Sequence, residues 1–172
     1  MSEIESINEI EKDLLRPAEV DRFANPTEAR RKAMDYLARR EYGRRELAQK
    51  LVAAGFASTT AIEAVDRLNE EGLQDDRRFV ESFLQSRINQ GKGPARIRQE
   101  LGERSVDAAM VDDVFDSVTE DWFELAEQVR IKKFGSALPT DFEEKARQMR
   151  FLQYRGFETA HIQAAVASHG DD

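Results

Sequence analysis

Apolar residues recur along most of the chain at the three- and four-residue spacing of amphipathic helices, with short polar or glycine-containing turns between them. The clearest helix follows Gly72, with Asp75 as its capping residue and Gly91 at its end. Five apolar residues share one face of this helix: Phe79, Val80, Phe83, Leu84 and Ile88. Gly93 and Pro94 suit the cap and first position of the next helix, where a missing N–H costs nothing. No run of alternating β-branched residues predicts a strand, so we expect an all-α protein.

The helices group in threes, and the group recurs roughly every 45–50 residues. In the first group, one helix begins at Asn25 or Thr27 and runs to about Tyr42. A second helix ends at Gly55. The third begins at a capping box, Thr60–Glu63, and its buried face includes Ile62, Val65 and Leu68.

Matching residues indicate that these groups are true repeats. Leu51–Phe56 aligns with Leu152–Phe157, and Gly43–Leu47 aligns with Gly93–Ile97. We predict an acidic, mobile N-terminal arm and three three-helix repeats, with the following bounds: 1–25 for the arm, then 26–74, 75–118 and 119–172. Because each repeat buries its apolar stripe partly against its neighbours, the expected architecture is an elongated, curved tandem array.

The third repeat carries several aromatic residues at helical spacing. Trp122, Phe123 and Phe134 are therefore predicted to pack in the core and not to form a platform for stacking bases. A further capping box, Thr140–Glu143, begins a helix whose inner face starts with Phe142.

The composition of the 172-residue chain excludes several kinds of chemistry. It has no cysteine, and its two histidines, His161 and His169, lie near the C-terminus. A disulfide, a thiol nucleophile and a cysteine- or histidine-rich metal site are therefore excluded. No apolar run approaches the roughly 20 residues that span a membrane. We expect a cytoplasmic protein with no membrane partner.

Charge is distributed in blocks, although the formal net charge is −8. Residues 30–50 carry eight basic and three acidic side chains, and residues 77–104 carry seven and three. Residues 105–128 carry eight acidic side chains and no basic one. A folded chain of this kind can present a basic and an acidic face, and local patches decide what binds.

No catalytic motif is present. The turn Gly91–Gly93 resembles a phosphate-binding loop, but the Walker spacing and the preceding strand are missing. Asp75 and Asp76 are better explained as a helix cap and a partner of the helix dipole than as metal ligands. We therefore predict no enzyme activity, no catalytic residue, no metal and no cofactor.

The basic residues beside the turns at Gly43 and Gly93 are the best candidates for a binding surface. If the repeats are equivalent, these turns lie at corresponding places and their charges can form a stripe. Arginine binds phosphates and carboxylates in a bidentate way. The candidate partner- or DNA-binding residues are Arg39, Arg40, Arg44, Arg45, Arg87, Lys92, Arg96 and Arg98. The alternative is that these side chains bind nothing and are simply solvated, since arginine is common in helices as a good helix former.

Taken together, residues 29–168 resemble the RecX family of bacterial regulatory proteins. The resemblance is carried by Tyr36–Tyr42 with Glu46 and Leu47, by Gly72–Phe79, by Arg87 with Gly91–Pro94, by Ile97–Leu101, and by Lys145–Met149 through Phe157. Gly43 stands where the family often has serine, which affects only a helix cap.

The resemblance implies a fold of tandem three-helix repeats and a function as a modulator, usually an inhibitor, of the RecA recombinase. Separately, we expect the protein to be a monomer. Members of this family lodge in the helical groove of the RecA–single-stranded DNA filament. There they hinder strand exchange, ATP hydrolysis and the stimulated self-cleavage of a repressor. Two other classes remain open: a stand-alone nucleic-acid-binding protein with helix-turn-helix-like hairpins, and a repeat scaffold for another protein. The nucleic-acid-binding protein is the first alternative, although the surplus of acidic residues argues against strong autonomous binding to DNA.

Overall fold

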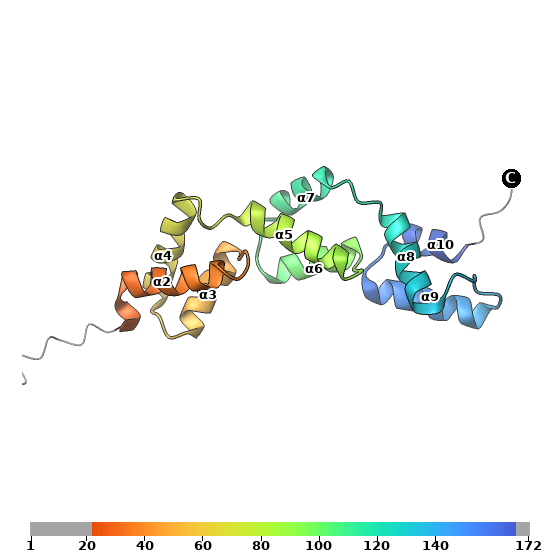
Figure 1. The fold of residues 1–172 in the computed structure, drawn as a ribbon, viewed down its shortest axis with the longest axis horizontal. Helices are drawn as coiled ribbons and strands as arrows, with labels where there is room; N and C mark the ends of the chain where they lie inside the picture. The colour runs from red at the N-terminus through yellow and green to blue at the C-terminus, as the bar shows by residue number, and fades with distance from the viewer. Residues whose placement is uncertain (1–21, 168–172) are drawn as a thin grey trace, which may run out of the picture. The chain divides into compact units, whose positions relative to one another are not determined.

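The computed structural model describes residues 22–167. Within this range the protein has nine α-helices, a 3-10 turn and no strand (Figure 1), which confirms the all-α prediction. The elements are η1 (Arg22–Ala24), α2 (Pro26–Leu37), α3 (Arg44–Ala53), α4 (Ser58–Glu70), α5 (Asp76–Asn89), α6 (Pro94–Glu103), α7 (Ala108–Ser117), α8 (Trp122–Phe134), α9 (Phe142–Arg155) and α10 (Thr159–Val166). Most of the predicted acidic arm, and His169, lie outside the described residues.

The chain forms two compact units, Met1–Gln74 and Asp75–Asp172. Helices α2–α4 belong to the first unit and α5–α10 to the second. The proposed bounds of the three repeats and the mobility of the arm stay predictions.

In the first unit, α2 packs against both α3 and α4. Asn25 caps α2, since its side-chain oxygen accepts a hydrogen bond from the Thr27 N–H at 2.9 Å. The buried core comprises Ala29, Ala33, Tyr42, Leu47, Leu51, Phe56, Ala61, Ala64, Val65 and Leu68. The prediction that the first helix continues to Tyr42 was wrong, because α2 ends at Leu37. Beyond that point the chain turns so that Tyr42 enters the core and its carbonyl accepts a hydrogen bond of 3.0 Å from the Gln74 side chain.

The capping box predicted at Thr60 was also wrong. Helix α4 begins at Ser58, with Ala57 at the cap position, so Thr60 is already inside the helix, where it is buried. The inner face of α4 is centred on Ala61, Val65 and Leu68. Ile62 lies beside that face and is 50% exposed, contrary to the expectation that it is buried.

In the second unit, helices α5–α10 contribute to a single apolar core. Its buried residues are Phe79, Val80, Phe83, Leu84, Ile88, Ile97, Leu101, Val111, Val114, Leu125, Ala126, Leu152, Phe157, Ile162, Ala165 and Val166. Asp75 caps α5 as predicted, accepting a hydrogen bond of 2.9 Å from the Arg78 N–H. Helix α9 is capped by Asp141 and not by Thr140, because the Asp141 carboxylate accepts a hydrogen bond of 2.8 Å from the Glu144 N–H.

Of the aromatic residues of the third group, Trp122 and Phe134 are partly buried, whereas Phe123 and Phe142 are exposed. Trp122 stacks on Phe115, with ring centroids 6.0 Å apart, and Phe134 meets Phe151 edge to face at 5.2 Å. Phe123 was expected in the core but is 49% exposed. Phe142, also expected inside, is 87% exposed because it is the first residue of α9 and projects beyond the buried part of that helix.

The aligned positions have matching local structures in the two units. The Phe56 N–H donates to the Leu51 carbonyl at 3.1 Å, and the Phe157 N–H donates to the Leu152 carbonyl at 3.2 Å. The intervening glycines both have positive φ, 108° and 92°. Gly43 and Gly93 are each the cap residue of the following helix. These equivalences support the internal repeat read from the sequence.

Candidate partner-binding surface

The turn between α5 and α6 is fixed against the end of α9. The Gly93 N–H donates to the Arg155 carbonyl at 2.8 Å, and the Ala95 N–H donates to the Gly156 carbonyl at 3.0 Å. A Cβ atom on Gly93 would lie 2.4 Å from the Gly156 backbone, so only glycine fits at this position. The most distinctive motif of the sequence is therefore a backbone joint between the second and third groups of helices. The N–H that a phosphate loop would offer to a ligand is bonded here to the protein itself.

Three of the predicted residues converge on one carboxylate. Arg87 Nε lies 2.6 Å from Glu100 Oε2, Lys92 Nζ lies 2.8 Å from Glu100 Oε1, and Arg96 Nε lies 3.1 Å from the same oxygen. Arg87 lies on α5, and Lys92 lies in the connection between α5 and α6. Arg96 and Glu100 are one helical turn apart on α6. We call these four residues the Glu100 cluster. It joins α5, the turn and α6.

The electrostatics of the cluster are dominated by the cations. Burial of Glu100, which is 8% exposed, would by itself raise the pKa of its carboxyl. Hydrogen bonds from Arg87, Lys92 and Arg96 outweigh that effect and lower the pKa of Glu100 to about 2. Three positive charges thus face one negative charge. The Arg96 side chain is 47% exposed, against 20% for Arg87 and 25% for Lys92, so Arg96 is the most accessible cation of the cluster.

Arg98 lies on α6 but points to a different partner. Its guanidinium pairs with Asp112 of α7 and covers the Phe115 ring, 4.1 Å from the ring centroid. Both side chains of the pair are exposed, at 41% and 65%. Arg98 therefore links α6 to α7 at the surface and does not join the Glu100 cluster.

The predicted residues of the first unit do not form a common cluster. Arg40 pairs with Glu46 at 2.7 Å and covers the Tyr42 ring at 3.6 Å from its centroid. Arg44 makes two hydrogen bonds to Asp66 of α4, at 2.9 Å and 2.6 Å. Each pair connects neighbouring segments of the same unit.

Arg39 and Arg45 are exposed, and the side chain of neither makes an ion pair or hydrogen bond with another residue of the described range 22–167. Arg45 lies beside Arg44 at the rim of a hollow of about 320 Å³ between α3 and α4. Of the eight candidates, the structure brings Arg87, Lys92 and Arg96 together. A continuous basic stripe across both units stays a prediction.

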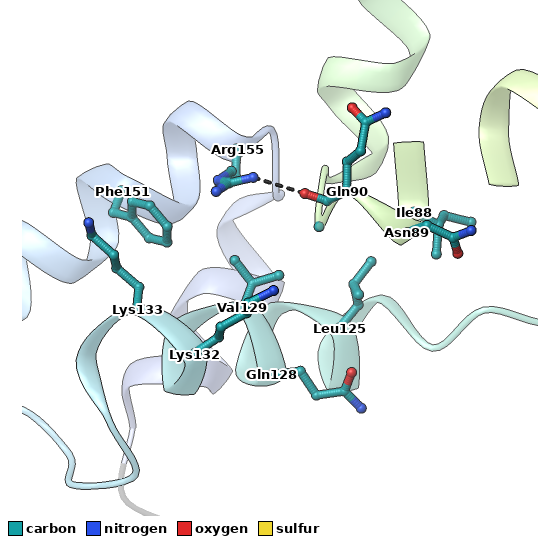
Figure 2. Close-up of a pocket in the computed structure, with 11 residues that line it drawn as sticks. Ile88, Asn89, Gln90, Leu125, Gln128, Val129, Lys132, Lys133, Phe151 and Arg155 are labelled. Atoms are coloured by element: carbon teal, nitrogen blue, oxygen red, sulfur yellow. Dashed lines mark hydrogen bonds between the residues drawn. The ribbon is translucent and has the colours of Figure 1, made fainter. Parts of the chain in front are cut away.

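A second basic surface was not predicted from the sequence. A hollow of about 450 Å³ lies between the end of α5, α8 and α9, and three cations line it: Lys132, Lys133 and Arg155 (Figure 2). The side chains of Lys132 and Lys133 make no ion pair or hydrogen bond with any other described residue. Arg155 donates a hydrogen bond of 2.9 Å to the Gln90 carbonyl. In the sequence, the only sign of this surface was the pair of lysines in the last turn of a helix. Such a pair is also explained by its favourable interaction with the helix dipole, so it did not by itself indicate a binding surface.

Other kinds of site find no support in the described part of the chain. Between residues 22 and 167, no three histidine, cysteine, aspartate or glutamate side chains are grouped in a way that could hold a metal ion. None of the helices described here is long and apolar enough to cross a membrane. His161 is buried, accepts a hydrogen bond of 3.2 Å from the Glu158 N–H and meets the Phe123 ring edge to face, so packing accounts for it.

Models of protein families match the chain in three successive segments. Residues 29–68 match the first three-helix domain of RecX, residues 75–114 the second, and residues 119–166 the third. The order of the three matches is that of the domains in the family.

Curated relatives and solved structures agree with these matches. The regulatory protein RecX of Halorhodospira halophila is 44% identical over 140 residues, which cover 81% of this chain and 87% of the relative. That of Pseudomonas entomophila is 47% identical over 137 residues, 80% of this chain and 88% of the relative. A crystal structure of regulatory protein RecX matches with a TM-score of 0.69 at 21% identity, over 82% of this chain and 72% of that one. The structure of RecX from Lactobacillus salivarius gives 0.67 at 18% identity, over 82% and 94%.

Proposed function

The chain belongs to the RecX family of regulatory proteins, and from this premise we propose that it regulates the RecA recombinase. It binds as a monomer in the helical groove of the filament that RecA forms on single-stranded DNA. Bound there, it inhibits strand exchange, ATP hydrolysis and stimulated repressor cleavage. The observation that carries the proposal is the match to all three family domains, in order, along one chain.

The repeated architecture supports binding to a repeating partner. Three three-helix domains in tandem can touch successive protomers of a filament, and linked contacts of modest strength add up to a high overall affinity. A regulator that works in this way needs no catalytic pocket.

Five of the eight basic candidates are placed to supply contacts, and these contacts are of two kinds. Arg39 and Arg45 are exposed and their side chains have no ion-pair or hydrogen-bond partner among the described residues, so they can meet an anion directly. Arg98 and Arg44 are held in exposed ion pairs, which contribute only about 0.2–1 kcal/mol each. Such pairs can exchange their internal carboxylate for a carboxylate or phosphate of the filament. Within the Glu100 cluster, Arg96 is the side chain most able to do the same.

The primary test is the DNA-dependent ATP hydrolysis of the cognate RecA with this protein added in substoichiometric amounts. We expect the rate to fall. An unchanged rate, together with salt-sensitive binding to bare DNA, would replace the proposal with an independent nucleic-acid-binding protein.

A variant pair then locates the contact surface. Replacing Arg96 and Arg98 by glutamine removes two charges and avoids placing a second carboxylate beside the buried Glu100, which a charge reversal at Arg96 would do. We expect inhibition to require at least about tenfold more protein, a loss of about 1.4 kcal/mol. The matched control replaces Lys145 and Arg150, both exposed on α9, by glutamine. Equal inhibition by the two variants would exclude the α6 surface.

A further inference from the structure

We propose that the hollow between the end of α5, α8 and α9 binds a short acidic segment of a protein partner, with an apolar side chain in the hollow and carboxylates on its basic rim. The hollow has a volume of about 450 Å³, within the range typical of ligand pockets. It lies wholly inside the second unit.

The charge of the hollow is of one sign. Lys132, Lys133 and Arg155 are the charged side chains among its eleven lining residues, and none of the eleven is acidic. Neither lysine has an ion-pair partner within the described range, and no carboxylate of that range pairs with Arg155. In this the hollow differs from the surface of α6, where Arg96 and Arg98 face carboxylates of the protein itself. An incoming carboxylate therefore displaces only water.

The floor of the hollow is apolar. Leu125 and Val129 of α8 point upward in Figure 2, towards the space between them and Arg155. Ile88 and Phe151 close two further sides. An aliphatic or aromatic side chain of a ligand loses contact with water here, while charged groups beside it reach the lysines.

A peptide fits this lining better than a nucleic acid does. The only aromatic ring of the hollow, that of Phe151, is met edge to face by Phe134 at 5.2 Å and is covered by the Arg155 guanidinium at 5.3 Å. The Arg155 guanidinium thus occupies one face of this ring, which leaves at most the other face for a base to stack on, and stacking supplies much of the affinity for single strands. The apolar floor has no counterpart in a phosphate backbone.

The walls of the hollow pack closely against one another. A Cβ atom on Gly91 would lie 2.8 Å from a methyl group of Val129, so α8 approaches the turn after α5 very closely. Arg155, at the end of α9, also ties that helix to the same turn through its hydrogen bond to the Gln90 carbonyl. A ligand thus meets a preformed surface, which lowers the entropy cost of binding.

The test uses the full chain and a fluorescein-labelled synthetic peptide, Glu-Asp-Leu-Phe-Asp-Glu, in a fluorescence anisotropy titration. The double variant Lys132→Glu with Lys133→Glu should bind the peptide at least about tenfold more weakly. The control Lys145→Glu with Arg150→Glu makes the same change in net charge at two exposed residues of α9 that do not line the hollow, and should bind within about twofold of the unchanged protein. A peptide with two serines in place of Leu and Phe should also bind more weakly, because it leaves the floor empty.

Three results would overturn the proposal: no saturable binding of the peptide, equal losses in the two double variants, or tighter binding of labelled oligo(dT) that is lost only when Lys132 and Lys133 are replaced. The last result would make the hollow a nucleic-acid site. Because the titration contains no RecA, its outcome is independent of the function proposed above.

Discussion

Replacing Glu100 by glutamine removes the only negative charge from the point where Arg87, Lys92 and Arg96 meet, and it leaves the shape of the side chain nearly unchanged. The amide oxygen can still accept up to two hydrogen bonds, but the NH₂ group is itself a donor and then faces a cationic donor of the cluster. Because the position is only 8% exposed, water cannot compensate fully for the lost charge. We therefore expect the second unit to lose stability.

The size of the loss follows from the pKa. The three cations lower the pKa of Glu100 from 4.5 to about 2. This difference of about 2.5 pH units means that folding favours the ionised carboxylate by about 3 kcal/mol. Removing one partner from a buried ionic cluster generally costs a comparable amount, about 3–5 kcal/mol. We expect Glu100→Gln to lower the free energy of unfolding by about 2–4 kcal/mol at pH 7.

The assay is urea unfolding followed by tryptophan fluorescence. Trp122 is the single tryptophan of the chain and stacks on Phe115 inside the second unit, so its signal reports on that unit. The matched control is Asp112→Asn, which removes a carboxylate from the exposed pair with Arg98. Its expected cost is below about 1 kcal/mol.

The pH dependence provides an independent check with a defined sign. Because the pKa of Glu100 is lower in the folded protein than its ordinary value of 4.5, its contribution to stability is complete above about pH 4.5 and is lost as the pH falls towards 2. The difference between the unchanged protein and Glu100→Gln should therefore shrink across that interval. If Glu100→Gln and Asp112→Asn unfold at the same urea concentration at pH 7, the cluster does not stabilise the unit and the argument fails.

Three further predictions concern the same unit. Gly93→Ala should destabilise it by at least about 2 kcal/mol because the new methyl group meets the Gly156 backbone, whereas Gly102→Ala, in the open on α6, should be neutral or stabilising in thermal unfolding. Arg130→Met removes the buried guanidinium that binds two carbonyls of the loop after α8, so limited proteolysis should cut that loop faster; an unchanged rate would count against the clamp. Asp75→Ala should cost about 1 kcal/mol in urea unfolding through loss of the α5 cap, and no loss would contradict the capping role.

The sequence predicted best what depends on local pattern. Asp75, Gly93 and Pro94 take the cap and first-turn positions expected of them, because these preferences depend on the neighbouring backbone alone. The predictions at Thr60 and Thr140 failed for a related reason. Other starting points compete within one turn of such a residue, and packing of the apolar face decides between them.

The partners of the charged side chains could not be predicted in the same way. The spacing of Arg96 and Glu100 is the four-residue spacing of neighbours on a helix and was available from the sequence. The convergence of Arg87 and Lys92 on the same carboxylate depends on how α5 meets α6. Lys132 and Lys133 likewise become part of a hollow only because α9 and the end of α5 lie beside α8 (Figure 2).

The difference between paired and unpaired cations also predicts how each surface responds to salt. On α6, an anion of a partner must displace Asp112 from Arg98, and added salt weakens the internal pair and the new contact alike. At Lys132 and Lys133 no internal pair is lost, so salt weakens only the contact with the ligand. Peptide binding at the hollow should therefore weaken markedly between about 50 and 200 mM salt, as expected for exposed charges at these ionic strengths. Anisotropy titrations at the two concentrations measure this, and an affinity that does not change would mean that the apolar floor alone holds the peptide.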